Sequence, residues 1–268
     1  RWWSSRASRT SPWRMAETRP RHPLLAAGPG RRELWLGNEA VVRGALEAGV
    51  GLVTGYPGTP ASEIGDCFFA LHRELDIPFE YSVNEKVALE VAFGASLTGT
   101  RALTSMKHLG LTSGADPLST MPYIGVVGGL VIVSAADPGC LTSPNEQDQR
   151  HLARMLGLPT LDPATPDEAR RMTAWAFELS EACELPVLLR ITTRVCHTRA
   201  SVELGPLPPR RPRGVFQKNP GRFLPTPVNA RKLRVELDRR LDRACALLTA
   251  SPFNRATVPP KALRRGVI

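Results

Sequence analysis

The chain has 268 residues, which is enough for one large domain or two small ones. Apolar residues make up 42% of it, but no run of about 18 uncharged apolar residues occurs, so we expect a buried core and no membrane partner. The net charge of +10 is uneven: residues 1–32 carry +7, residues 33–199 carry −8 and residues 200–268 carry +11. Because the central part is acidic, the basic composition gives little support to nucleic-acid binding, and we expect no nucleic-acid partner.

The five cysteines are scattered, and none belongs to a Cys-x-x-Cys pair. This spacing argues against a structural zinc site or an iron–sulfur cluster held by this chain alone. An odd number of dispersed cysteines also argues against a secreted disulfide scaffold. The cysteine pattern therefore indicates a reducing compartment, and we expect the cytoplasm.

Residues 1–32 predict a disordered basic leader. They contain eight arginines and three tryptophans without hydrophobic periodicity, and the first methionine is Met15. Two interpretations stay open, namely sequence upstream of a start near Met15 and an Arg- and Ser-rich transit peptide. The longest apolar stretch of this segment, from Leu24 to Ala27, is too short for a secretory signal.

Residues 33–204 predict one domain in which helices and buried strands alternate. Apolar positions spaced three and four residues apart predict helices at 38–49, 61–75, 84–98, 145–156 and 166–183. Short apolar runs predict strands at 51–54, 79–82, 101–106, 129–135, 158–161 and 186–191, the last of them ending the domain, with a short helix between 106 and 129. Continuous apolar strands between helices indicate a doubly wound, mainly parallel α/β sheet with helices on both faces.

The composition changes after Leu204. Residues 205–268 predict a Pro-rich linker, with seven prolines between 205 and 227, and then a basic amphipathic helix at about 229–249. Because Leu233, Leu237 and Leu241 share one side of this helix, we expect it to pack on the body or on a partner rather than on a membrane.

Polar side chains follow the predicted strands at the edge where doubly wound sheets bind ligands. No phosphate-binding loop, nucleophile elbow or zinc-protease motif occurs, so these residues predict a polar cleft without fixing a reaction. The residues are the turn 56–60, which presents Thr59, then Glu85 at the start of a helix, Lys107 with His108, and Asp137.

Four strings in this order resemble a known family: YPGTPASEI at 56–64, SVNEKVALE at 82–90, MKHLGL at 106–111 and NEQD at 145–148. They resemble the thiamine diphosphate-dependent 2-oxoacid:ferredoxin oxidoreductases and, among them, the alpha subunits that act on indolepyruvate. The resemblance extends from about residue 37 to 199, and more loosely to about 255. It implies the thiamine diphosphate-binding fold, in its pyrimidine-binding form.

The resemblance implies roles for two residues of the cleft. Glu85 occupies the position of a glutamate that hydrogen-bonds N1′ of the aminopyrimidine ring and helps to activate the cofactor. Thr59, on the turn with Pro57 and Gly58, occupies a position that contacts the cofactor or the carboxylate of the 2-oxoacid. The structural alternatives stay open: a carboxylate favoured by the helix dipole for Glu85, and a turn residue for Thr59.

Two further parts of the resemblance are less specific. Lys107 and His108 match the arylpyruvate branch and would neutralise the substrate carboxylate or move protons, against the alternative of a plain strand-end role. Asp137 and the stretch 145–148 also match, but the resemblance implies no chemical role for them. We expect Gln147 and Asp148 to be helix caps or interface contacts.

The sequence also departs from this family. It contains neither the G-D-G motif and downstream Asn that bind the diphosphate and Mg²⁺, nor the Cys-rich domain that holds [4Fe-4S] clusters. The resemblance therefore implies the N-terminal, pyrimidine-binding part of an enzyme that converts arylpyruvates to aryl-acetyl-CoA and reduces ferredoxin. Such a chain would be inactive alone.

Its implied partners are the missing domains, in cis or on another chain, together with ferredoxin, a 2-oxoacid and coenzyme A. Two alternatives stay open. One is the pyrimidine-domain subunit of a split thiamine diphosphate-dependent 2-oxoacid decarboxylase. The other is a truncated, non-enzymatic fragment that only docks onto a partner.

Overall fold

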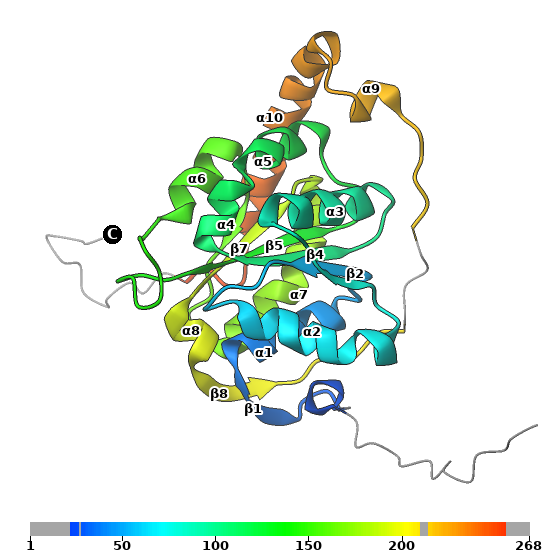
Figure 1. The fold of residues 1–268 in the computed structure, drawn as a ribbon. Coiled ribbons are helices and arrows are strands. Elements are labelled where there is room, and N and C mark those ends of the chain that lie inside the picture. Colours follow the sequence, from blue (N-terminus) through cyan, green and yellow to red (C-terminus); the bar gives the residue numbers. More distant parts are fainter. Residues whose placement is uncertain (1–21, 27, 210–213, 256–268) are drawn as a thin grey trace, which may run out of the picture.

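The computed structural model describes residues 22–26, 28–209 and 214–255. At its centre is a six-stranded parallel sheet in the order β3-β2-β4-β5-β7-β6 (Figure 1). The predicted α/β fold with a mainly parallel sheet is confirmed. The strands are β2 (Leu52–Gly55), β3 (Phe79–Tyr81), β4 (Ala102–Lys107), β5 (Leu130–Ala136), β6 (Thr160–Leu161) and β7 (Val187–Thr192).

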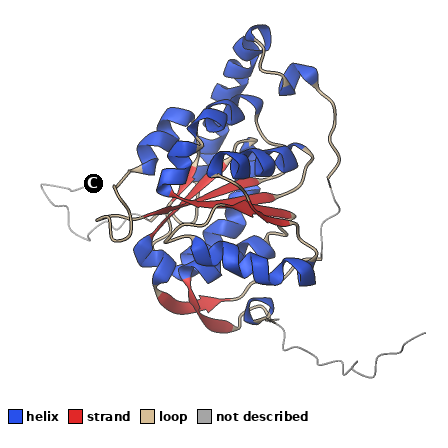
Figure 2. Ribbon diagram, in the orientation of Figure 1, coloured by secondary structure: helices blue, strands red, loops and turns tan. Residues whose placement is uncertain are grey.

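Helices cover both faces of the sheet, as Figure 2 shows. One face is covered by α1 (Gly37–Glu47), α2 (Ser62–Leu75) and α7 (Pro166–Cys183). The other is covered by α3 (Glu85–Leu97), α4 (His108–Ser113), α5 (Ala115–Ile124) and α6 (Gln149–Leu156). Successive strand residues point to opposite faces, so Val131 and Val133 join one apolar cluster while Leu130 and Ile132 join the other. This double burial explains why the strands are continuously apolar.

The connections bring the residues of the predicted site to one edge of the sheet. β2 and β4 are neighbours, yet the helix after β2 is α2, on one face, and the helix after β4 is α4, on the other. Ligands of doubly wound sheets bind at such a point, beyond the carboxyl ends of the strands. The connections at this edge are 56–61, 82–84 and 137–148.

The strand predicted at 186–191 is not the last one. After β7 come α8 (Thr193–His197) and β8 (Arg199–Glu203), which pairs antiparallel with β1 (Arg32–Leu36) outside the main sheet. Only Trp35 of β1 and Val202 of β8 are fully buried, so neither strand has the apolar run of a central strand. Two more boundaries differ: α6 begins at Gln149 rather than at 145, and the stretch between 106 and 129 holds two helices instead of one.

Part of the predicted leader is folded. The 3-10 turn η1 (Pro23–Leu25) buries Leu24 and Leu25 in the core cluster that includes α1. The folded body therefore extends upstream of the predicted boundary between residues 32 and 33. The part of the predicted leader at 1–21 lies outside the described residues.

The segment after Leu204 contains α9 (Pro220–Phe223) and α10 (Pro227–Thr249). α10 starts two residues before its predicted range and ends with it. It buries Leu233 and Leu237 and packs against α5 and α7, as expected for a helix that covers the body. Among the described helices, none is both long and apolar enough to cross a membrane.

Candidate active site

The turn after β2 places Thr59 at the carboxyl edge of the sheet. It is closed by Ala61 N, which donates to Gly58 O at 2.8 Å, and the Thr59–Pro60 peptide bond is cis. Thr59 is exposed, and no side chain or backbone group in the described part of the chain hydrogen-bonds its hydroxyl. The turn therefore presents a hydroxyl group with its donor and acceptor capacity unused.

Glu85 is the first residue of α3. The preceding residue, Asn84, is the N-cap, because its side chain accepts a hydrogen bond from Val87 N at 2.9 Å. The half-buried Glu85 side chain lies on Gly110 of α4, where an added β-carbon would be 2.8 Å from a Glu85 carboxylate oxygen. Within the described ranges, no group forms a hydrogen bond or ion pair with that carboxylate. Two helices thus position a carboxylate that remains open to a ligand.

Lys107 lies between the Thr59 turn and the loop after β5. A β-carbon on Gly58 would be 3.4 Å from Lys107 Cβ, so the turn packs against the stem of this lysine. Lys107 Nζ donates to Thr142 O at 3.0 Å. Because an ammonium group has three protons, two of them remain for another acceptor.

His108 is fully buried at the start of α4, with 0% of its surface exposed. Its Nε2 lies 3.0 Å from Asn145 O, and since a carbonyl only accepts, Nε2 carries the proton in this contact. Its Nδ1 is buried without a partner among the described residues. The structure therefore joins His108 to the loop 137–148, and its role toward a substrate stays a prediction.

Asp137 organises the loop 137–148. Its buried carboxylate accepts hydrogen bonds from Thr142 N at 2.7 Å, Ser143 Oγ at 2.5 Å and Thr193 Oγ1 at 2.8 Å. Burial alone raises the pKa of Asp137, but the hydrogen bonds outweigh burial and hold the pKa well below its usual range. Asp137 is therefore a charged anchor for the loop.

Asp148 is a helix cap, as the sequence predicts, whereas Gln147 contacts a neighbouring helix of the same chain. Asp148 is the N-cap of α6, accepting from Arg150 N at 3.0 Å. The Arg150 side chain also donates to Asp148 and is the main reason that the pKa of Asp148 lies below its usual range. Gln147 Oε1 accepts a hydrogen bond from Thr112 Oγ1 of α4 at 2.5 Å. The stretch 145–148 thus fastens the loop to α4 and α6.

Sequence reasoning missed Asn38 and Glu63, which lie against the Thr59 turn. Asn38 Nδ2 donates to Pro60 O and to Glu63 Oε2, each at 2.7 Å. His197, the last residue of α8, places Nε2 3.4 Å from Glu63 Oε1. Asn38 is 22 residues from Pro60, and the only local signal is a polar residue near a helix start, so no pattern in the sequence predicts this contact.

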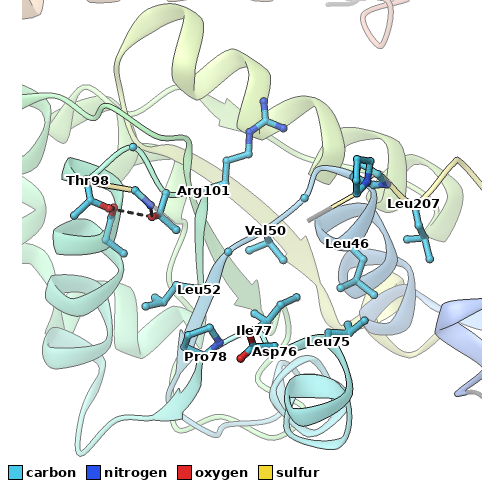
Figure 3. A pocket seen from close by; sticks show the side chains of 18 of the residues that line it. Leu46, Val50, Leu52, Leu75, Asp76, Ile77, Pro78, Thr98, Arg101 and Leu207 are labelled. Atoms are coloured by element: carbon cyan, nitrogen blue, oxygen red, sulfur yellow. Dashed lines mark hydrogen bonds between the residues drawn. The ribbon is translucent and has the colours of Figure 1, made fainter. Parts of the chain in front are cut away.

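A cavity of about 440 Å³ lies at the opposite edge of the sheet, near the amino ends of β2 and β4 (Figure 3). Its walls are largely apolar and include Leu46, Val50 and Ile77. The guanidinium group of Arg101 at its wall is already bound to Glu181 and to Ala48 O. Such a hollow offers little to a charged substrate, so the polar groups around Glu85 and Thr59 are the better candidate site.

Hydrogen-bonding groups rather than metal ligands gather at the carboxyl edge. Among the residues that the structure describes, no three His, Cys, Asp or Glu side chains lie close enough together to hold a metal ion. The edge offers the Glu85 carboxylate, the Thr59 hydroxyl and the Lys107 ammonium group. These three groups suit an organic ligand that carries both donors and acceptors.

Comparisons with known proteins show what the chain resembles. A family model described as pyruvate flavodoxin/ferredoxin oxidoreductase, thiamine diphosphate-binding, matches residues 43–229, a range that includes Thr59, Glu85 and Lys107. Indolepyruvate oxidoreductase subunit IorA of Methanothermobacter marburgensis is 47% identical over 232 residues, which are 87% of this chain and 38% of that protein. The same subunit of Thermococcus kodakarensis is 45% identical over 231 residues, 84% of this chain and 36% of that protein. The chain thus spans less than two fifths of the length of these relatives.

A solved structure has the same fold. The 2-oxoglutarate:ferredoxin oxidoreductase from Magnetococcus marinus, solved with 2-oxoglutarate, coenzyme A and succinyl-CoA bound, matches 84% of this chain and 46% of its own with a TM-score of 0.66. The two sequences are 16% identical in that match, so the likeness concerns the fold alone.

Proposed function

This chain belongs to the pyruvate flavodoxin/ferredoxin oxidoreductase family, in its thiamine diphosphate-binding part, and we propose that it binds the aminopyrimidine ring of that cofactor in an enzyme that oxidises arylpyruvates. One observation carries the proposal: the half-buried Glu85 carboxylate, fixed by α3 and Gly110, has no partner in the described chain. A carboxylate held in this way is suited to share a proton with a ring nitrogen. The identity of 42–47% to indolepyruvate oxidoreductase subunits supports arylpyruvates as the substrate class.

Each residue of the candidate site has a proposed role that follows from its functional group. When bound, thiamine diphosphate supplies the nucleophilic carbon and takes up the electron pair released by decarboxylation. Glu85 holds a proton at N1′ of the pyrimidine ring. Thr59 donates its hydroxyl proton to the cofactor or to the 2-oxoacid carboxylate. Lys107 contributes a positive charge beside that carboxylate through its two remaining ammonium protons, and His108 keeps the neighbouring loop 137–148 in place.

Other parts of the complex complete the reaction in this proposal. Mg²⁺ and the diphosphate group are bound by a second domain, either in cis or on another chain. A ferredoxin-like domain holds [4Fe-4S] clusters, which pass two electrons to ferredoxin, and coenzyme A accepts the acyl group. The same complex is expected in the cytoplasm.

The test replaces Glu85 in the purified complex that contains this chain. We expect Glu85→Gln to lower arylpyruvate-dependent ferredoxin reduction by about 10²–10⁴-fold, because general acid–base catalysis contributes in that range. Deuterium exchange at C2 of the bound cofactor, followed by NMR, reports on the same proton without any electron transfer and should slow in parallel. Glu90→Gln, an exposed carboxylate on the same helix, is the matched control.

Two outcomes would decide against the proposal. Wild-type exchange and ferredoxin reduction in Glu85→Gln would remove Glu85 from the reaction. A complex that decarboxylates the 2-oxoacid but contains no iron or sulfide would instead support the split decarboxylase.

A further inference from the structure

Asn38 occupies a position from which it can control the Thr59 turn. We infer that Asn38 is a positioning residue, which with Glu63 sets the place of the Thr59 hydroxyl relative to the cofactor or the substrate. The inference rests on the proposed function and adds to it a residue outside all four strings of the family resemblance. Asn38 itself reaches no ligand, because it is fully buried beside the turn.

The hydrogen bonds of Asn38 allow only one orientation of its amide. Nδ2 lies 2.7 Å from Pro60 O and 2.7 Å from Glu63 Oε2, and both of these oxygens only accept. Turning the amide over would bring Oδ1 against two other oxygens, which is repulsive. Both amide protons are therefore committed to the turn and to the residue that follows it.

Close contacts with other elements fix the start of α1, where Asn38 lies. Gly37, the preceding residue, packs so closely on the backbone of α8 that an added β-carbon would be 2.7 Å from Val195 C. On the other side, the Glu39 carboxylate accepts from Leu36 N at 2.7 Å and fixes the start of α1. α1 packs in turn on α7 and α2, as Figure 1 shows. Through its hydrogen bonds, Asn38 thus fixes the turn relative to α1 and the helices on which α1 packs.

The turn is held at two successive points. Pro60 follows Thr59 directly, and the bond to Pro60 O fixes the Pro60–Ala61 peptide group, one residue beyond the one that presents the hydroxyl. Glu63, in the first turn of α2, binds Asn38 through Oε2 and faces His197 Nε2 at 3.4 Å through Oε1. Movement of the turn away from its place would leave the buried Asn38 donors without partners, which is unfavourable.

The decisive variant is Asn38→Asp in the purified complex, because it keeps the shape of the side chain and removes both donors. We expect amide hydrogen exchange in residues 55–62 to become at least about tenfold faster, while exchange in β7 stays unchanged. The cofactor dissociation constant or kcat/KM should worsen by about 10–100-fold, since small displacements of a positioned group have effects of that size.

Two further variants separate positioning from a general loss of stability. Asn229→Asp is the matched control, because the Asn229 amide also donates to backbone carbonyls, Leu224 O at 2.9 Å and Pro220 O at 3.3 Å, but at the start of α10. It should leave exchange at 55–62 and cofactor binding unchanged. Glu63→Ala removes the second partner of Asn38 at a side chain that is 40% exposed and should loosen the turn even where Asn38→Asp does not fold.

A double-mutant cycle with Thr59→Val tests the route of the effect. If Asn38 acts through Thr59, the double variant should bind the cofactor and turn over no worse than the more damaged single variant. Strictly additive losses would overturn the inference, as would unchanged exchange at 55–62 in Asn38→Asp. Either result would leave the proposed function intact, provided that Thr59→Val itself weakens cofactor binding or turnover. A wild-type complex that binds no thiamine diphosphate would instead overturn both the proposed function and the inference.

Discussion

Gly110 packs closely against the Glu85 side chain in the candidate site. A β-carbon there would be 2.8 Å from a Glu85 carboxylate oxygen and 2.9 Å from the carboxyl carbon, so Glu85 occupies the space that a side chain would need. We expect Gly110→Ala to displace the carboxylate and weaken cofactor binding by at least about tenfold in the complex.

The stability of the fold should respond little to that substitution. Alanine favours a helix over glycine by about 1 kcal/mol, which offsets the crowding around residue 110. The control is Gly94→Ala on α3, where nothing lies within 4 Å of the added carbon. Gly94→Ala should gain about 0.5–1 kcal/mol in urea unfolding with cofactor binding unchanged. Unchanged cofactor binding in Gly110→Ala would show that the Glu85–Gly110 contact does not position the carboxylate.

For single residues, the sequence predicts which side chains lie at the site better than it predicts their hydrogen-bond partners. The strand-end pattern and the family strings both point to Thr59 and Glu85, and the structure brings both to the carboxyl edge. The partners of Lys107 and His108 are backbone carbonyls 35 and 37 residues away. Every residue has such a carbonyl, so no residue pattern distinguishes the ones that are used.

The loop 137–148 depends on a single carboxylate. Replacement of Asp137 by Ala would leave the donors of Thr142, Ser143 and Thr193 without their acceptor, and we expect a loss of about 1–3 kcal/mol in unfolding free energy at pH 7. Because the folded pKa of Asp137 lies below its ordinary value of 3.8, this contribution is complete above pH 3.8 and is lost as the pH falls through the folded pKa.

Urea unfolding of wild type and Asp137→Ala at pH 7 and at pH 3 measures this difference. The gap between the two proteins should be smaller at pH 3. Asp116→Ala, which removes an exposed carboxylate paired with Lys86, should change stability by no more than about 0.5 kcal/mol at either pH. A gap that widens toward low pH would contradict the role given to the Asp137 charge.

Elements with their own periodicity are predicted well, and elements defined by a distant partner are not. α7 has the predicted bounds, because its apolar positions recur every three to four residues from Pro166 to Cys183. β1 and β8 pair with each other across more than 160 residues, and each buries a single residue fully, Trp35 and Val202. Their strand character depends on that pairing, so neither segment shows a strand pattern when it is considered alone.

The basic charge after Leu204 has a structural use. Arg240 Nη1 donates to Tyr123 O at 3.0 Å, and Arg222 Nη2 donates to Val126 O at 2.7 Å, so the two arginines bind carbonyls at and just beyond the end of α5. Both also face Glu184. Burial, the largest effect on Arg240, holds its pKa below the usual range of arginine. These two cations join the C-terminal helices to the body, so part of the basic charge of this segment has a structural role.

One arginine joins three separate segments of the folded body. Arg43 is fully buried and donates to Glu47 Oε1 at 2.7 Å, to Leu24 O at 2.8 Å and to Gly205 O at 2.6 Å. We expect Arg43→Met to lower the unfolding free energy by about 3–5 kcal/mol, because it leaves a buried carboxylate without this partner. Exchange at residues 22–26 should rise as well.

Urea unfolding and hydrogen exchange measure these two effects. Arg239→Met is the control, since that arginine is exposed and, among the described residues, pairs only with Glu236 at the surface; it should cost less than about 1 kcal/mol. Equal effects of the two variants would show that the Arg43 contacts contribute no more than a surface ion pair.

The pairing of β1 with β8 affects how easily such a domain can be inserted into another protein. Arg32 is opposite Glu203, and Leu36 is opposite Arg199, so the chain enters and leaves the sheet-bearing part of the molecule side by side. A unit with adjacent ends can be inserted into a host loop, or its neighbours reordered, without stretching any strand of the core. The strand pair thus places the two ends of residues 32–203 next to each other, so a connection from a host loop to this unit would need no long spacer.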